Sequence, residues 1–261
     1  MKSYWNVVAG AMVVASLGAA PAGAQTGAQP APPTPTTTVE VTRDSPWSAD
    51  VGIGFDNSIS GNINSGAVGR LNGQTVVVLK NSYEDVYGTG LHFRFGGGYM
   101  LNEDTEARVT FTLQSLDADL VPLGDIGTGK LYAQYADYQS FGIDFGLRRY
   151  ADFAPKIRGY GEGTLGIAFV DETDVVLIAP STNLAGNATD FYDKTAAFTL
   201  GANVGVLFQV HEKVGVYGQI GLRYVTGMSA VDNLQGTGLE TINDKSARWT
   251  MPVIAGIRVR F

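Results

Sequence analysis

Residues that commonly carry out chemistry are sparse in this sequence. It contains two histidines, His92 and His211, and no cysteine. Neither the H-x-H nor the H-x-x-x-H spacing of metal ligands occurs, so we expect no metal site and no cofactor. A catalytic histidine needs a serine or an acid beside it. No serine lies two residues from either histidine. We therefore expect the protein not to be an enzyme.

One glycine-rich segment has the spacing of a dinucleotide-binding loop. Residues 161–166 read Gly-Glu-Gly-Thr-Leu-Gly, which matches G-x-G-x-x-G. That pattern binds pyrophosphate only where a strand precedes it and a helix follows. No helical periodicity follows this one. Its glycines are instead predicted to let a β-strand curve.

Charged residues that alternate with apolar and aromatic ones are more informative. A period of two places them on one face of β-strands. An arginine facing lipid near the bilayer midplane costs about 2–4 kcal/mol, so these side chains are predicted to face the lumen of a membrane barrel. The predicted set is Arg94, Arg108, Asp144, Arg148, Glu162, Arg223 and Arg258.

This set of charged residues predicts that side chains plug the lumen of the barrel. If the strands on either side of residues 151–156 pair through a turn, Asp144 and Glu162 lie roughly opposite each other and repel. The inner arginines, above all Arg94, Arg148 and Arg223, would be their counterions. Since side chains can fill the interior of an eight-stranded barrel, we predict an acid–arginine network that plugs the lumen. A gated small pore is the alternative.

The elements that position these residues are eight long alternating runs. About 9–11 tilted residues cross the hydrocarbon layer, whereas ordinary strands average about 5–6 residues. Ten strands is the competing count, because two connections contain β-rich runs, 75–79 and 174–178, which we interpret as hairpin extensions outside the membrane. The predicted strands are 47–57, 86–100, 106–116, 138–150, 157–170, 196–210, 214–226 and 249–261.

The connections between the runs alternate in length. Outer-membrane barrels have short periplasmic turns and long extracellular loops. The pattern therefore predicts an all-β fold, a transmembrane antiparallel up-and-down β-barrel, with both termini periplasmic and the long loops extracellular. The short connections are 101–105, 151–156 and 211–213, and the long ones are 58–85, 117–137, 171–195 and 227–246.

Aromatic residues gather at the strand ends. Trp47, Tyr99, Phe208 and Phe261 are predicted at the periplasmic rim, and Phe55, Phe141, Phe169, Tyr224 and Trp249 at the outer rim. Two such girdles are typical of a membrane protein.

The start of the chain predicts export. Lys2, the weakly apolar stretch 7–20 and Ala22-Gly23-Ala24 have the pattern of a secretory signal peptide, residues 1–24. Residues 25–46 are rich in Pro and Thr and are predicted to be an extended periplasmic leader. The barrel is predicted to span 47–261. The net charge of −7 argues against a nucleic-acid partner.

The last strand carries the sharpest resemblance. Gly256, a hydrophobic residue at Val259, and Phe261 at the end resemble the assembly signal of the small outer-membrane β-barrel family, which includes the transmembrane domain of outer membrane protein A, outer membrane protein X and the opacity-type porins. Val259 departs from the usual aromatic residue there. The resemblance implies insertion into the outer membrane by the barrel-assembly machinery with periplasmic chaperones.

These observations predict a monomeric outer-membrane barrel with a structural and surface-interaction role. A narrow porin is the first alternative. A lipid-modifying barrel enzyme that depends on His92 is the second. Acidic loop residues could bind divalent cations together with lipopolysaccharide, although a solvated acidic surface is the preferred interpretation.

Overall fold

The computed structural model describes residues 45–71, 73–182, 184–231 and 237–261. The predicted signal peptide and all but the last two residues of the predicted leader lie outside this part. None of the helices in the described part is long and apolar enough to cross a membrane.

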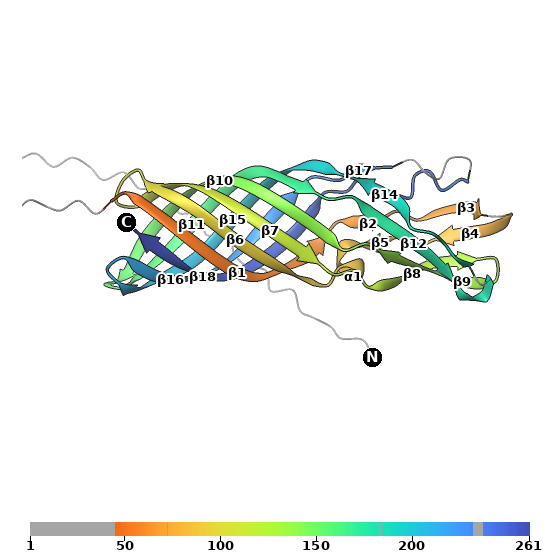
Figure 1. Cartoon of the computed structure of the whole chain (residues 1–261), viewed down its shortest axis with the longest axis horizontal. Coiled ribbons are helices and arrows are strands. Elements are labelled where there is room, and N and C mark those ends of the chain that lie inside the picture. Colours follow the sequence, from red (N-terminus) through yellow and green to blue (C-terminus); the bar gives the residue numbers. More distant parts are fainter. Residues whose placement is uncertain (1–44, 72, 183, 232–236) are drawn as a thin grey trace, which may run out of the picture. The chain divides into compact units, whose positions relative to one another are not determined.

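Eight antiparallel strands close into a barrel in the order β1-β18-β16-β15-β11-β10-β7-β6 (Figure 1). The prediction of eight strands is confirmed, and so is the up-and-down order, because each strand pairs with its neighbours along the chain and β1 pairs with β18. The barrel strands are β1 (Trp47–Ser60), β6 (Thr89–Met100), β7 (Thr105–Leu116), β10 (Tyr138–Ala154), β11 (Ile157–Val170), β15 (Thr195–His211), β16 (Val214–Val225) and β18 (Arg248–Arg260).

The wall of the barrel has the opposite polarity to a soluble protein. Outward-pointing apolar residues remain exposed, with Val51 at 57% and Leu165 at 56%, while the charged Arg148 and Glu162 are 1% and 4% exposed inside. A soluble protein instead buries its apolar side chains and exposes its charges. The two faces alternate strictly, so the pleat of each strand sorts the residues.

Aromatic residues pair at the strand ends. At the end that holds Trp47, its ring lies 4.9 Å from that of Tyr99. At the other end Tyr224 lies 5.1 Å from Trp249. Cross-strand pairing places these rings side by side on the outer face, because Trp47 lies opposite Tyr99 and Tyr224 lies opposite Trp249.

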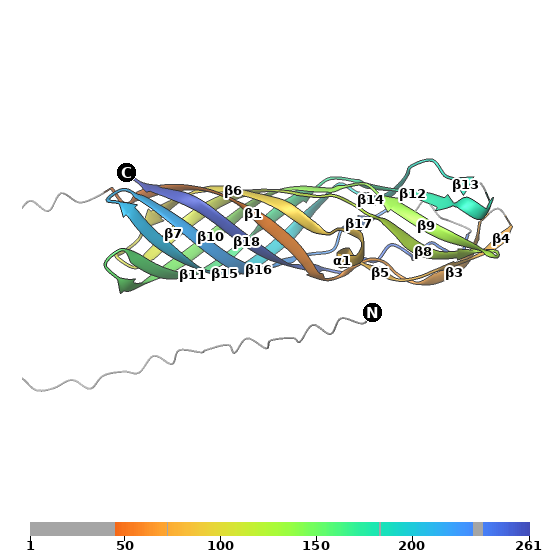
Figure 2. The same cartoon turned by 90° about the horizontal axis from the view of Figure 1, so that it is seen from below.

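The two ends of the barrel differ in their connections. Short turns at 101–104, 155–156 and 212–213 lie at the same end as Ser48 and Arg260, which pair with each other. The long connections leave from the opposite end (Figure 2). The alternation of short and long connections in the sequence therefore corresponds to the two ends of the barrel.

The long connections form a second sheet, which we call the extension. Its strand order is β17-β14-β12-β9-β8-β4-β3, with β13 paired to β12. All four long connections contribute strands to it. The strands are β3 (Ala67–Leu71), β4 (Gln74–Val78), β8 (Leu120–Ile126), β9 (Gly129–Tyr135), β12 (Thr173–Ala179), β13 (Leu184–Ala185), β14 (Thr189–Asp193) and β17 (Ser229–Ala230). A 3-10 turn, η1 (Pro180–Thr182), follows β12.

The two β-rich runs, predicted as hairpin extensions, are joined to strands of other connections. The run at 74–78 pairs with β3 but also with β8, and the run at 173–179 pairs with β9 and β14. The physical reason is that an isolated two-stranded hairpin is marginally stable in water, whereas joined strands satisfy one another's backbone groups.

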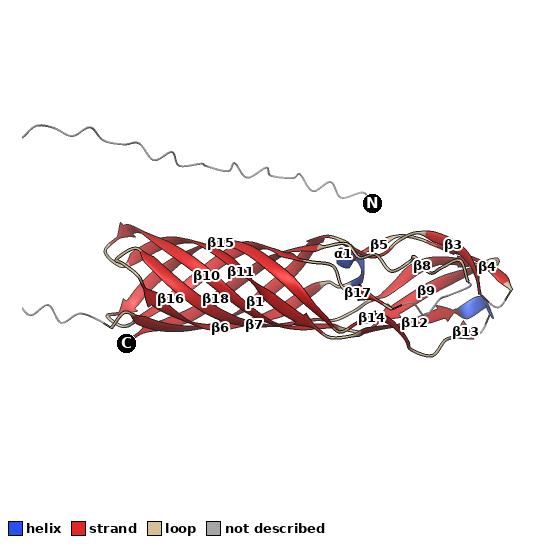
Figure 3. Ribbon diagram, turned by 90° about the horizontal axis from the view of Figure 1, so that it is seen from above, coloured by secondary structure: helices blue, strands red, loops and turns tan. Residues whose placement is uncertain are grey.

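A short helix lies where the barrel meets the extension (Figure 3). A two-stranded ladder of β2 (Asn62–Asn64) and β5 (Asn81–Ser82) precedes α1 (Tyr83–Val86). Ser82 and Asp85 form a capping box: the Ser82 hydroxyl accepts from the Asp85 N–H at 3.1 Å, and the Asp85 carboxylate accepts from the Ser82 N–H at 2.8 Å. This cap holds the short helix so that Tyr83 and Val86 enter the apolar core.

Candidate functional site

The lumen of the barrel holds a dense set of buried charges. All seven residues predicted to face it do so and are buried. Five carboxylates face six guanidinium groups, so the interior is close to neutral. The buried acids are Asp50, Asp56, Glu106, Asp144 and Glu162, and the buried arginines are Arg94, Arg108, Arg148, Arg223, Arg248 and Arg258.

Glu162, on β11, is the centre of the first cluster. Arg148 donates from Nε to Glu162 Oε2 at 2.6 Å, and Arg94 donates from Nη2 to Oε1. Nε of Arg108 lies 3.5 Å from Oε2. The Arg148 guanidinium also stacks 4.1 Å above the ring of Tyr160. Three strands therefore place a cation against one carboxylate.

Asp144 and Glu162 do not lie opposite each other, which corrects the prediction. Glu162 pairs across the strands with Arg148, and Asp144 pairs with Gly166. The reason is that β10 continues to Ala154, beyond its predicted end at Tyr150, so the turn comes later and the register moves. The register places opposite charges side by side where repulsion was expected.

Glu106, the first inward residue of β7, is the centre of a second cluster. Arg258 donates to it from both terminal guanidinium nitrogens, from Nη2 to Oε1 at 2.6 Å and from Nη1 to Oε2 at 2.8 Å. Tyr150 donates to Oε2 at 2.8 Å and Ser48 donates to Oε1 at 2.5 Å. Arg108 joins the two clusters, because its guanidinium lies 3.5 Å from Glu162 and 3.3 Å from Glu106. It also donates to Asp50.

A third cluster lies nearer the extension. Asp56 accepts hydrogen bonds from Gln114 at 2.6 Å and Thr250 at 3.1 Å. Nδ1 of His92 lies 3.6 Å from the same carboxylate, and His92 is 2% exposed. His211, the other histidine, ends β15 and is exposed.

The remaining predicted pair lies beside this third cluster. Asp144 accepts from the Thr199 hydroxyl at 2.6 Å, and Nη2 of Arg223 lies 3.6 Å from Asp144. A cavity in this region has a volume of about 30 Å³ and is lined by His92, Arg94, Asp144 and Arg223 among others.

Above the third cluster the interior becomes apolar. Leu116, Val170 and Val225, on the inner face of the barrel, are at most 3% exposed and belong to the same core as the interior of the extension. Arg248 marks the boundary, because its guanidinium lies 4.0 Å above the ring of Tyr138. The lumen is thus charged over most of its length and apolar where the extension begins.

Sequence reasoning missed part of the network. Asp50, Asp56 and Glu106 were not assigned, although each occupies an inner position of an alternating run. Strict use of the period would have found them. Arg248, also not assigned, occupies an inner position of the last strand, as the predicted Arg258 does. No local signal indicates which acid meets which arginine, because the partners lie up to 152 residues apart.

The residues of the predicted assembly signal lie on β18 and just after it. Gly256 is flanked by Gly52 of β1 and Tyr217 of β16. A Cβ at Gly256 would lie 2.6 Å from the Tyr217 ring, so this site accepts only glycine without rearrangement. Val259 pairs with Ala49, and Phe261 donates its backbone N–H to Trp47. These contacts close the barrel.

Among the residues that the structure describes, no group of three or more His, Cys, Asp or Glu side chains could hold a metal ion. The glycine-rich segment 161–166 lies within β11, between Arg158 and Val170, and is extended throughout. It therefore lacks the helix that a dinucleotide-binding loop requires.

The chain matches no protein-family model and no curated protein sequence. Solved structures do resemble it. Neisserial surface protein A is 15% identical with a TM-score of 0.47 and matches over 83% of this chain and 98% of its own. OprG of Pseudomonas aeruginosa is 12% identical with a TM-score of 0.39, over 84% and 97%. Ail of Yersinia pestis is 11% identical with a TM-score of 0.34, over 81% and 98%. At these values the likeness says nothing about function.

Proposed function

We propose that this chain is an integral outer-membrane β-barrel whose role is structural and whose extension takes part in surface interactions. The observation that carries the proposal is the inverted wall, apolar outside and charged inside. A closed barrel pairs every strand edge, which a chain in lipid requires. Export through a signal peptide and the alternating connections support a position with both termini in the periplasm and the extension outside the cell.

The contents of the lumen support a plug rather than a pore. The three clusters join inward-pointing side chains of strands that are not neighbours in the barrel, such as β18 and β7, and the apolar core follows at the extension end. The cavity beside His92 has a volume of only about 30 Å³. A porin would need a continuous aqueous path.

The position of His92 argues against the lipid-modifying alternative. Its side chain points inward and is 2% exposed, with Asp56 beside it. A substrate in the surrounding lipid would have to pass through the wall to reach it. General acid–base catalysis requires the base within hydrogen-bond reach of the substrate.

The extension supports the surface role. Its strands come from four connections and share one buried core. Rigid elements of this kind hold binding surfaces in a fixed shape. Val68 and Leu79 are 66% and 52% exposed on it. The barrel is proposed to be a monomer in contact with outer-membrane lipid and lipopolysaccharide, inserted by the barrel-assembly machinery with the help of periplasmic chaperones.

The double variant Glu162→Gln with Asp144→Asn tests the plug. We expect the folded, detergent-purified protein to lose its resistance to heat, seen as a lower temperature for the mobility shift on gels, while bilayer conductance stays at the wild-type level. A large rise in conductance would instead indicate that the network is a gate and would contradict the proposed plug.

A further inference from the structure

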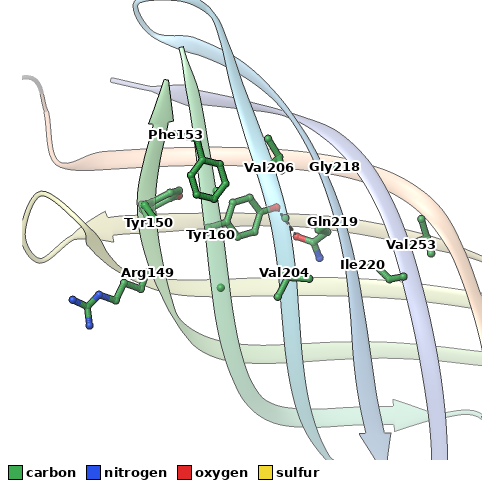
Figure 4. A pocket seen from close by; sticks show the side chains of 14 residues that line it. Arg149, Tyr150, Phe153, Tyr160, Val204, Val206, Gly218, Gln219, Ile220 and Val253 are labelled. Atoms are coloured by element: carbon green, nitrogen blue, oxygen red, sulfur yellow. Dashed lines mark hydrogen bonds between the residues drawn. The ribbon is translucent and has the colours of Figure 1, made fainter. Parts of the chain in front are cut away.

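An apolar groove crosses the outer surface of the barrel over β10, β11, β15, β16 and β18. Its volume is about 870 Å³, which lies within the range of about 300–1,000 Å³ of small-molecule sites. Figure 4 shows Phe153 toward one end of the groove and Val253 toward the other, with Val204 and Ile220 between them. On the proposed function, this surface faces lipid.

The groove exists where exposed outward positions have no side chain. Gly161 of β11 and Gly218 of β16 point outward and are exposed. A Cβ added to either would meet no atom within 4 Å. Glycine is unfavourable inside a strand, and neither position requires it for space. The space that these residues leave open is therefore not used by the protein's own side chains.

A single cation lies at the edge of the groove. Arg149 points outward from β10 and lines the groove. It pairs across the strands with Thr105, the first residue of β7, so it lies at the short-turn end of the wall. Arg149 makes no ion pair or side-chain hydrogen bond with any residue in the described ranges 45–71, 73–182, 184–231 and 237–261. Nearby Arg158, in contrast, is held by Asp152 at 2.5 Å.

The charge of Arg149 selects the occupant. The outward positions of the eight barrel strands carry no Asp or Glu, so the lipid-facing wall of a second copy of this chain, between its rims, presents no carboxylate to the guanidinium. A phospholipid has a group for each part of this site: an acyl chain for the apolar groove and a phosphate for the arginine. Arginine binds phosphate with two parallel hydrogen bonds, and its long stem lets the charge reach the headgroup level.

We propose that this groove binds one acyl chain of an anionic phospholipid from the periplasmic leaflet, with its phosphate on Arg149. The inference rests on the proposed membrane position of the wall. It predicts a lipid that stays bound to the purified barrel in preference to the bulk detergent.

The test measures lipid retention by native mass spectrometry of the full chain folded in a zwitterionic detergent. Phosphatidylglycerol and phosphatidylcholine with identical acyl chains are titrated in turn. We expect one tightly held phosphatidylglycerol per barrel. Arg149→Gln should weaken its binding about tenfold, which corresponds to about 1.4 kcal/mol, and the double variant Gly161→Val with Gly218→Val should weaken both lipids.

Two matched controls keep the result specific. Gly97 also points outward, on β6 across the barrel, and the nearest atom to an added Cβ is 3.6 Å away, so Gly97→Val adds the same group outside the groove. Lys213→Gln removes an exposed charge from a turn at the same end. Both controls should retain the lipid.

The inference would be overturned by equal retention in the wild type and the groove variants, or by groove variants that alter the oligomeric mass and leave lipid retention unchanged. The heat-induced mobility shift is recorded for every variant. If the wild type lacks that shift, the membrane-barrel proposal fails. If the shift is present and lipid retention does not depend on the groove, only the groove inference fails.

Discussion

Glu106 and Glu162 each pair with more than one arginine in the lumen. Loss of either carboxylate charge would leave these arginines without that counterion. Glu106 accepts from Arg258, Tyr150 and Ser48, and Glu162 accepts from Arg94 and Arg148. A buried ion pair is weak evidence for net stability, but removal of one partner leaves an uncompensated buried charge. The network therefore acts as a set of mutual constraints on the barrel's closed form.

Glu106→Gln tests this at a single residue. The change leaves the Arg258 guanidinium without its carboxylate, so we expect the free energy of unfolding to fall by about 3–5 kcal/mol. Urea unfolding in micelles, followed by the gel mobility of the folded form, measures it.

Asp152→Asn is the matched control for this measurement. Asp152 pairs with Arg158 at 2.5 Å, but its side chain is 67% exposed. Exposed pairs contribute about 0.2–1 kcal/mol. Equal losses in the two variants would contradict the assignment of the lumen as the stabilising site.

Asp244, in the extension, gives a prediction about pH. Partial burial raises its pKa, but hydrogen bonds from Ser246 and Ser65 outweigh this and hold the pKa below its ordinary value of 3.8. Because the folded pKa is the lower one, its contribution to stability is complete above pH 3.8 and is lost as the pH falls through the folded value.

We therefore expect the extension to become sensitive to pepsin as the pH falls below 3.8, while the barrel stays protected. Asp244→Asn should remove the pH-dependent part of this protection. Asp125→Asn serves as the control, because the Asp125 carboxylate pairs with an exposed lysine, Lys130. An identical pH profile for wild type and Asp244→Asn would count against the role of this carboxylate.

At the scale of elements, the extension is held together by contacts between segments from different connections. The hydroxyl of Tyr192, on β14, lies 2.5 Å from the Ile63 carbonyl and 2.6 Å from the Asp244 carbonyl. Those two residues belong to the first and fourth long connections. Asn243, also in the fourth, pairs with Asn64 in the first. The first, third and fourth long connections are thus tied to one another.

Tyr192→Phe should loosen these ties. The single hydroxyl hydrogen that the two carbonyls share is lost, and a lost buried hydrogen bond costs about 1–3 kcal/mol. We expect faster amide hydrogen exchange in β14 and in residues 62–64, with no change in the eight barrel strands. Tyr132→Phe is the control, because the hydroxyl of Tyr132 makes no hydrogen bond within the described part of the chain. If exchange in the barrel rises equally, the extension and barrel unfold as one unit.

At the scale of the whole molecule, the apolar core of the extension begins where the charged part of the lumen ends. Leu116 and Val225 belong to the barrel wall and to that core at once. The charged clusters, however, are built from the eight strands alone. The plug should therefore not depend on the extension.

Replacement of the four long connections by short turns tests this. We expect a barrel that still shifts its mobility on heating and conducts no more than the wild type in planar bilayers, because the network of Glu106, Glu162 and their arginines remains. Conductance that rises only in this variant would place the barrier in the extension instead.

Much of the architecture was predictable from local pattern. A period of two identifies a strand and its two faces without knowledge of its partners, so all eight barrel strands and the inward direction of residues such as Arg94 and Arg223 followed from the sequence. The wall groove was not predictable, because Gly161 and Gly218 lie 57 positions apart and become neighbours only across β15.

The sequence by itself determined which side chains face lipid and which face the axis, since the pleat of a strand sorts residues one by one. The tertiary structure decided which charges meet. Continuation of β10 to Ala154 moved the register and placed Arg148 beside Glu162. The tertiary structure also decided that the long connections join into one sheet. Both outcomes depend on pairing between distant segments, and a shift of a few residues in a turn changes every partner without changing any local pattern.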